Sequence, residues 1–250
     1  MKNCSLFILV FSILAFTACN PKLNEEANFQ LLPLPKQISW NGSSGINPAS
    51  LEPALQKAKQ EFTSGDKLEG FKDSGLQLEL VSDLNLKNQG YELSISGNQI
   101  LIKSNTEEGL WYGLMTLDQI TQDALDQNAY LPFTEIKDEP ALAYRAVHLD
   151  VKHHLEKKEY YYELMDRLAA MKINAIIIEI EDKLDYQLQP KVGAPDAYSI
   201  ADWKAISDYA MARNIRISPL VQGLGHASFI LKHPEYIPIR DDPESDWAFN

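Results

Sequence analysis

The segment Asn174–Ile180, NAIIIEI, indicates the fold class, because its three consecutive isoleucines leave no face of a strand for water. Strands that are apolar on both faces belong to parallel sheets covered by helices. Similar segments flank it, RAVHLDV at 145–151 and IRISPLV at 215–221. Helical patterns lie between them, at 160–172 and after the capping box that Ser199 and Asp202 form. This alternation predicts three β/α units and an α/β fold.

The three units resemble the beginning of a (β/α)8 barrel, which needs roughly 250 residues and seldom fewer than about 200. The segment 139–250 is shorter than that. We therefore expect it to be the N-terminal part of a TIM barrel, cut within the barrel. A small, complete doubly wound domain is the alternative, but nothing after Val221 would close its sheet.

The segment 31–138 predicts a separate α+β domain. Alternating apolar and polar residues at 76–81, 91–96 and 99–104 indicate half-buried strands, and Gly97-Asn98 indicates a hairpin between the last two. Helices are expected at 51–62 and after Asn105, which we expect to cap the second helix. The second helix is apolar on nearly every side, so it should pack against the sheet.

The first 19 residues predict an export signal. Lys2 precedes a short apolar run at 6–15, and Cys19 stands at the expected cleavage point. This arrangement resembles a bacterial lipoprotein signal, so we expect lipid on Cys19, a polar tether at 20–30, and a periplasmic or cell-surface protein anchored to the membrane. An ordinary secreted signal or a short membrane anchor is the alternative. Cys4 lies within the signal, so the mature chain has no disulfide and no cysteine-based metal site.

The charge balance argues against one class of partner. Asp and Glu outnumber Lys and Arg 35 to 23, which gives a formal net charge of −12. Such a surface repels phosphate backbones, so nucleic acid is not expected to bind.

Polar residues follow each predicted barrel strand, where α/β enzymes place their active sites. Asp150 and His153 follow the first strand, Glu179, Glu181 and Asp182 the second, and His226 the third, after Gly223 and Gly225. Solvent-exposed histidines and structural ion pairs would give the same pattern. The spacing of these residues supports no metal site. The residues alone therefore indicate a carboxylate- and histidine-rich mouth of an acidic α/β enzyme.

Several motifs resemble glycoside hydrolase family 20, the β-N-acetylhexosaminidases. YRAVHLDVKHH at 144–154, MKINAIIIEIED at 171–182 and SPLVQGLGHASFILKHPEY at 218–236 are similar to the first three barrel strands, the last especially to the hexosaminidase D-like branch. LLPLPKQISW at 31–40 and GYELSISGNQILIKSNTEEGLWYGLMTLDQI at 90–120 resemble the non-catalytic domain that precedes the barrel. Lys152 and Ala146 depart from the family's usual Arg and Gly.

The resemblance implies roles for individual residues. Arg145 matches the arginine that binds hydroxyls of the terminal sugar, although a salt bridge at the bottom of the barrel is the alternative. Asp182 and His226 match a relay that touches the general acid, so we expect these two side chains to pair. Glu181 and His153 are expected in the same pocket.

The resemblance also implies a substrate-assisted, retaining reaction without metal or cofactor, which releases terminal GlcNAc or GalNAc from glycans. The acetamido oxygen attacks the anomeric carbon, an Asp orients it and a Glu protonates the leaving oxygen.

That catalytic pair belongs to a Gly-x-Asp-Glu motif on the fourth strand, and the 250 residues contain no such motif. Asp138-Glu139 precedes the barrel and is not the pair. We therefore expect the catalytic Asp-Glu pair beyond Asn250, and we expect the 250 residues alone to be inactive.

Two other functions stay open. One is a glycan-binding lipoprotein that retained the scaffold without catalysis. The other is a related substrate-assisted enzyme of the O-GlcNAcase type.

Overall fold

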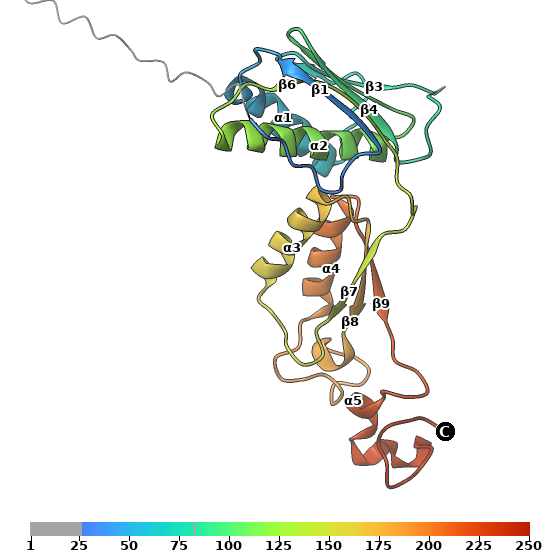
Figure 1. Ribbon diagram of the computed structural model, residues 1–250. Helices are drawn as coiled ribbons and strands as arrows, with labels where there is room; N and C mark the ends of the chain where they lie inside the picture. The colour runs from blue at the N-terminus through green and yellow to red at the C-terminus, as the bar shows by residue number, and fades with distance from the viewer. Residues whose placement is uncertain (1–26, 83) are drawn as a thin grey trace, which may run out of the picture.

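The computed structural model describes residues 27–82 and 84–250. An α+β part built on one sheet leads into an α/β part built on a second sheet, as Figure 1 shows. The expected signal at 1–19, Cys19 included, and most of the expected tether lie outside the described residues.

The first sheet has six strands in the order β1-β6-β4-β5-β3-β2. The predicted hairpin is confirmed, because β4 and β5 pair antiparallel with Ser96 opposite Gln99 across the Gly97-Asn98 turn. β1 and β6, which the sequence analysis did not predict, pair with each other at the edge of the sheet. The strands are β1 Gln37–Ser43, β2 Lys72–Asp73, β3 Leu76–Leu80, β4 Tyr91–Ser96, β5 Gln99–Ser104 and β6 Pro132–Asp138.

Helices α1 (Pro48–Ser64) and α2 (Glu107–Asp126) pack on the face of this sheet that carries Tyr91, Leu93 and Ile95. Thr106, and not Asn105, caps α2, since the Thr106 hydroxyl accepts from the backbone N–H of Gly109. The expectation for Asn105 was therefore wrong by one residue. Its amide instead donates to the carbonyls of Leu84 and Leu86 and fixes the preceding loop.

The second sheet is parallel, in the order β7-β8-β9, and confirms the predicted α/β alternation. β8 is the central strand and is buried except for Ile177, as its unbroken apolar run indicated. Ser199 and Asp202 form the predicted capping box at the start of α4. The elements are β7 Ala146–Asp150, α3 Lys158–Ala170, β8 Ala175–Glu179, α4 Ile200–Met211 and β9 Arg216–Leu220.

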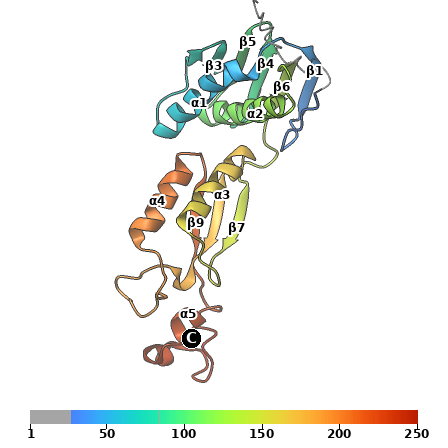
Figure 2. The ribbon, with the colours of Figure 1, turned by 90° about the vertical axis from the view of Figure 1, so that its left-hand side faces the viewer.

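Helices α3 and α4 lie on one face of this sheet, in front of the strands in Figure 2, and Figure 1 shows no helix of the described chain on the other face. Register explains what the open face carries: His148 lies opposite Ile177, which lies opposite Ser218. His148 and Ser218 are exposed, and so is Asp150, two residues along β7. One face of the sheet is thus a packed core and the other is open and partly polar.

Three further short helices follow the carboxyl ends of the strands, as Figure 1 shows for the last part of the chain. A backbone hydrogen bond of 3.0 Å from Ala227 to the Trp247 carbonyl brings the last residues back to the loop after β9. The helices are η1 Glu181–Lys183, α5 Ser228–Leu231 and η2 Pro234–Ile239.

Side-chain contacts join the two parts. Lys172, just after α3, is buried, and its ammonium donates to the Tyr91 hydroxyl at 2.9 Å and lies 3.3 Å from the Asp138 carboxylate. Asn214 donates to the Tyr112 hydroxyl at 2.9 Å. The two parts therefore meet through a buried ion pair and hydrogen bonds as well as through the contact of α2 with α3.

Candidate active site

The carboxyl edge of the second sheet gathers the polar side chains that follow its strands. The register places Asp150 of β7, Glu179 of β8 and Leu220 of β9 side by side. Because the strands are parallel, the segments that leave them also lie at this edge.

Glu179 is the centre of the arrangement. Its side chain is only 5% exposed, yet it carries a carboxylate at the very end of the central strand. Lys152 lies 2.8 Å from one carboxylate oxygen, and the amide of Gln222 donates to the same oxygen. The ring of His148 lies 3.2 Å from the other oxygen. A buried carboxylate needs such partners, and residues on or after the two neighbouring strands, β7 and β9, supply them.

The cation of this cluster serves two carboxylates. Lys152 lies 2.7 Å from Asp150 as well as 2.8 Å from Glu179, and both contacts raise its pKa. The hydrogen bond from Lys152 lowers the pKa of Glu179, with Gln222 adding to the effect and burial opposing it. Glu179 is therefore held as an ionised carboxylate that orients donors from its neighbours.

Glu181 and Asp182 lie just beyond, in the single turn η1. Burial raises the pKa of the Glu181 carboxyl, with nearby Glu179 and Asp182 acting in the same direction. Glu181 also has a left-handed backbone, with φ of 45°. A carboxyl group that retains its proton more readily than usual is suited to general acid catalysis.

His226 lies in the loop after β9 and is exposed. Its ring packs on Trp247 with the ring centres 4.3 Å apart. Although Gly223 and Gly225 lie in this loop, its left-handed positions are Leu224 and His226, with φ of 61° and 57°. A Cβ at Gly225 would lie 3.2 Å from the Trp247 indole nitrogen, so the indole would have to shift by a few tenths of an ångström.

Three residues other than glycine thus have a left-handed backbone in the two loops at this edge: Glu181, Leu224 and His226. Each such residue costs about 1–3 kcal/mol, and strain of this kind gathers at functional sites. The strain and the buried carboxylate together mark the carboxyl edge as the candidate active site.

The expected pair of Asp182 and His226 does not form in this structure. Asp182 lies 3.4 Å from Lys183 and 3.6 Å from Lys232, and among the described residues no hydrogen bond joins it to His226. His226 instead packs against the Trp247 ring, with the two rings tilted by 50°. One oxygen of Asp182 is buried without a hydrogen-bond partner in the described chain.

Arg145 lies at the start of its strand, as the sequence indicates, and away from the carboxyl edge. It precedes β7, at the opposite end of the strand from Asp150. Its guanidinium donates to the carbonyls of Lys172 and Leu142, both at 2.8 Å, and to the Gln89 side chain at 2.9 Å. Five residues of β7 span about 16 Å, so Arg145 does not share a sugar with Asp182 and His226 here. Its contacts fit the other interpretation, a structural position at the bottom of the strands, except that its partners are neutral.

His153 is at the predicted edge but exposed, on the segment between β7 and α3. Asp138 and Glu139 lie away from the edge, as expected, and pair with Lys172 and Lys36 respectively.

The last residue of the chain, Asn250, lies beside the short helices that follow β9. Its backbone N–H donates to the Ile239 carbonyl at 3.1 Å, at the end of η2. The Asp-Glu pair that we expect beyond Asn250 is not part of these 250 residues. No contact of the described residues tests that expectation, so it stays a prediction.

Known proteins resemble this chain along most of its length. A family model described as glycosyl hydrolase family 20, domain 2, matches residues 30–139. Hexosaminidase D of Homo sapiens is 35% identical over 98 residues, which cover 39% of this chain and 20% of that protein. Beta-hexosaminidase of Porphyromonas gingivalis is 24% identical over 278 residues, which cover 91% of this chain and 35% of that protein. The family model and these relatives support glycoside hydrolase family 20 for this chain.

Solved structures of family 20 share the fold. Chitobiase of Flavobacterium johnsoniae superposes with a TM-score of 0.64 at 24% identity, over 84% of this chain and 36% of that one. The β-N-acetylhexosaminidase of Streptomyces coelicolor gives a TM-score of 0.65 at 21% identity, over 85% of this chain and 50% of that one. The chain spans about a fifth to a third of the length of the curated relatives it matches.

Sequence reasoning missed two residues that contact Glu179. His148 and Gln222 were not singled out, yet both contact Glu179. The alternation along β7 was a usable signal for His148, because it shares a face with Asp150. Gln222 had only a positional signal, because it directly follows the third strand, and its contact with Glu179 is visible only in the fold.

The described residues show neither a metal centre nor a membrane span. Across 27–82 and 84–250, no group of three or more His, Cys, Asp or Glu side chains is arranged to hold a metal ion. In that same part of the chain, no helix has the length and apolar character needed to cross a membrane.

Proposed function

We propose that the carboxyl edge around Glu179 belongs to the sugar-binding site of a β-N-acetylhexosaminidase, which releases terminal GlcNAc or GalNAc from glycans. The match to family 20 supports hydrolysis of N-acetylhexosaminides, and the relatives above are named hexosaminidases. The observation that supports placing the sugar-binding site at this edge is the buried Glu179. Residues on or after β7 and β9 contact its carboxylate, and left-handed backbone lies beside it. N-acetylhexosamine-containing glycans are then the partners.

The architecture fits the first three units of a (β/α)8 barrel preceded by a non-catalytic domain. In such a barrel, helices cover the outer face and the inner face is filled by layers of side chains. The covered and open faces of the β7-β8-β9 sheet correspond to these two faces.

The proposed reaction is substrate-assisted. The acetamido oxygen of the substrate attacks its own anomeric carbon while the leaving oxygen takes a proton, and water then opens the cyclic intermediate with retention. The 250 residues lack the Gly-x-Asp-Glu motif that supplies the orienting Asp and the acid Glu in this family. We therefore propose that this pair lies beyond Asn250 and that the 250 residues do not hydrolyse glycosides by themselves.

The described residues have supporting roles in this proposal. Glu179 orients Lys152, His148 and Gln222, whose donors suit sugar hydroxyls. Glu181 contributes a carboxyl group whose raised pKa favours the protonated form. His226, exposed and braced by Trp247, presents its imidazole at the same edge.

Hydrolysis of 4-nitrophenyl N-acetyl-β-D-glucosaminide tests the function. The protein translated from the complete gene should release nitrophenol from this substrate and not from the β-glucoside, which has no acetamido oxygen to attack. The 250-residue chain should release none from either. Equal cleavage of the glucoside would refute substrate assistance, and cleavage by the 250 residues would refute the need for another Asp-Glu pair.

One observation favours a second function. Because the sequence has no Gly-x-Asp-Glu, a glycan-binding protein without catalysis is consistent with the same edge. A complete gene that lacks the motif, and whose product binds N-acetylglucosamine without cleaving glycosides, would establish this alternative.

We also propose export and a lipid on Cys19, which would hold the protein at a bacterial membrane, on the basis of the lipoprotein-like signal in the sequence. Metabolic labelling with an alkyne fatty acid tests it. Wild type should be labelled and Cys19→Ser should not, whereas equal labelling of both would contradict the proposal.

A further inference from the structure

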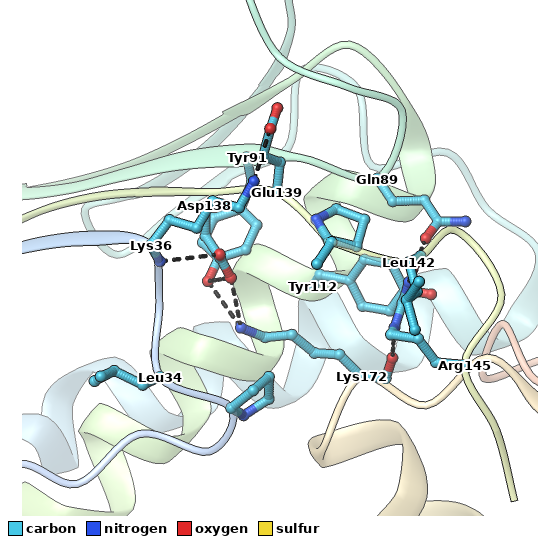
Figure 3. Close-up of a pocket in the computed structure, with 13 residues that line it drawn as sticks. Leu34, Lys36, Gln89, Tyr91, Tyr112, Asp138, Glu139, Leu142, Arg145 and Lys172 are labelled. Atoms are coloured by element: carbon cyan, nitrogen blue, oxygen red, sulfur yellow. Dashed lines mark hydrogen bonds and ion pairs between the residues drawn. The ribbon is translucent and has the colours of Figure 1, made fainter.

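A cavity of about 310 Å³ lies where the α+β part meets the start of β7, away from the carboxyl edge. We call it the junction pocket, and Figure 3 shows its lining. Its size is at the lower end of the range for small-molecule sites, roughly 300–1,000 Å³. Residues before β1, at the start of β4, on α2, after β6 and after α3 all contribute to it, so the pocket exists only when the two parts are docked.

The charges around the junction pocket are not balanced. Asp138 is neutralised by Lys172 at 3.3 Å, and Glu139 by Lys36 at 2.9 Å. Arg145 lines the same pocket, and no carboxylate of the described chain lies within ion-pair distance of it. Among the described residues, Arg145 is therefore a pocket cation without a paired carboxylate, in a protein whose formal net charge is −12.

The Arg145 guanidinium is held in one orientation by neutral groups. Nε donates to the Lys172 carbonyl, and Nη1 donates to the Leu142 carbonyl and to the Gln89 side chain. The guanidinium also lies over the Tyr112 ring, 5.2 Å from its centre. Within residues 27–82 and 84–250, the hydrogen bonds of the guanidinium use Nε and Nη1, and Arg145 also lies close enough to the Tyr112 hydroxyl to oppose the rise in the pKa of Tyr112 that burial causes. A half-buried charge that lacks a counter-charge is suited to bind an anion from solution.

The walls of the pocket are mainly apolar. Pro33, Leu34, Pro140, Ala141 and Leu142 line it. Leu34 and Leu142 are 75% and 68% exposed, which is unusual for two large apolar side chains at one opening. These walls disfavour inorganic phosphate or sulfate, which are strongly hydrated, and favour an organic acid with an apolar body.

We propose that the junction pocket binds a small monocarboxylate, with the carboxylate on the Arg145 guanidinium and the apolar body between Leu34, Pro140 and Leu142. The site is separate from the carboxyl edge and does not depend on the proposed glycosidase function. Because both parts of the chain line the pocket, such a ligand would also favour their docked arrangement.

The probe is 4-phenylbutyrate, whose size, about twelve heavy atoms, suits the cavity. At ordinary ligand efficiency a molecule of this size binds with a Kd of about 1 mM. Titration of the isotope-labelled 250-residue chain, followed by NMR, should give saturable shifts that include the Arg145 Nε–H signal. The neutral amide of the same acid should bind at least tenfold more weakly.

A matched pair of variants tests the location. Leu142→Glu places a carboxylate beside Arg145 on an exposed side chain, so it should compete internally and weaken binding of the acid at least tenfold. Leu188→Glu makes the same change at a side chain that is 93% exposed and outside the pocket, and should leave the Kd unchanged. Arg145→Gln should also abolish binding, with the fold checked by its NMR spectrum.

The proposal would be overturned by a lack of saturable binding of 4-phenylbutyrate, by equal binding of its amide, or by an unchanged Kd in Leu142→Glu. Loss of binding in Leu188→Glu as well as in Leu142→Glu would place the site elsewhere and would likewise overturn it.

Discussion

Replacing Lys152 with methionine should destabilise the protein far more than replacing its partner Glu179 with glutamine. Lys152→Met leaves the Glu179 carboxylate, whose side chain is 5% exposed, with only His148 and Gln222 beside it. Removal of one partner from a buried ion pair costs about 3–5 kcal/mol. Lys152 itself is 20% exposed, so we expect about 2–3 kcal/mol.

Glu179→Gln is the milder change because Lys152 keeps a second carboxylate. Asp150 lies 2.7 Å from the Lys152 ammonium, so no buried charge is left alone. We expect a loss of about 1 kcal/mol, as for an ordinary hydrogen bond. The double variant should lose about 1–2 kcal/mol, which gives a coupling energy of about 2 kcal/mol between the two residues.

Urea denaturation at pH 7.5, followed by circular dichroism, measures all four free energies of unfolding. The order matters more than the absolute values: Lys152→Met lowest, then the double variant, then Glu179→Gln. Equal losses in the two single variants, or a coupling energy near zero, would refute the conclusion that Lys152 is what holds Glu179 at the strand end.

Two smaller predictions concern backbone strain and pH. Glu181→Gly should stabilise the protein by about 0.5–1 kcal/mol, because relief of the left-handed backbone, about 1–2 kcal/mol, exceeds the entropy cost of glycine. Burial raises the pKa of Glu181, so the folded protein loses stability as this carboxyl group ionises with rising pH. The stability gained by Glu181→Gly should therefore be larger at pH 7 than at pH 4. A variant that is less stable than wild type at pH 7 would contradict this prediction. The backbone N–H of Lys87 and the Lys36 ammonium lower the pKa of Glu139 to about 2, so its stabilisation is present above pH 4.5 and disappears as pH falls toward 2. Between pH 4.5 and pH 2, the free energy of unfolding of Glu139→Gln should therefore fall less steeply than that of wild type. Parallel curves for the two proteins would disprove a lowered pKa at Glu139.

The sequence predicted the elements whose signal is local. The Gly97-Asn98 turn, the Ser199 and Asp202 box and the unbroken apolar run of β8 each specify their structure within a few residues, and each is found as expected. β1 and β6 were missed because their pairing joins segments about 100 residues apart and β1 is mostly exposed, so neither strand has a strong apolar alternation.

The candidate site was predictable only in outline. Its position after the strands followed from the parallel topology, and Glu179 followed from its place at the end of β8. The contacts themselves did not follow. Arg145 is held at the opposite end of β7 by carbonyls of Lys172 and Leu142, and His226 is turned onto Trp247 by a segment about 20 residues later in the chain. Neither contact has a signature in local sequence.

The most direct test of the central claim, that the edge around Glu179 serves hexosaminide hydrolysis, is kcat/KM on 4-nitrophenyl N-acetyl-β-D-glucosaminide. The protein translated from the complete gene should lose about 10²-fold in Glu179→Gln, since misplacement of groups at a site by about 1 Å has that effect. The melting temperature of the Glu179→Gln variant should change little. An unchanged kcat/KM in Glu179→Gln would contradict the assignment of the site to this edge.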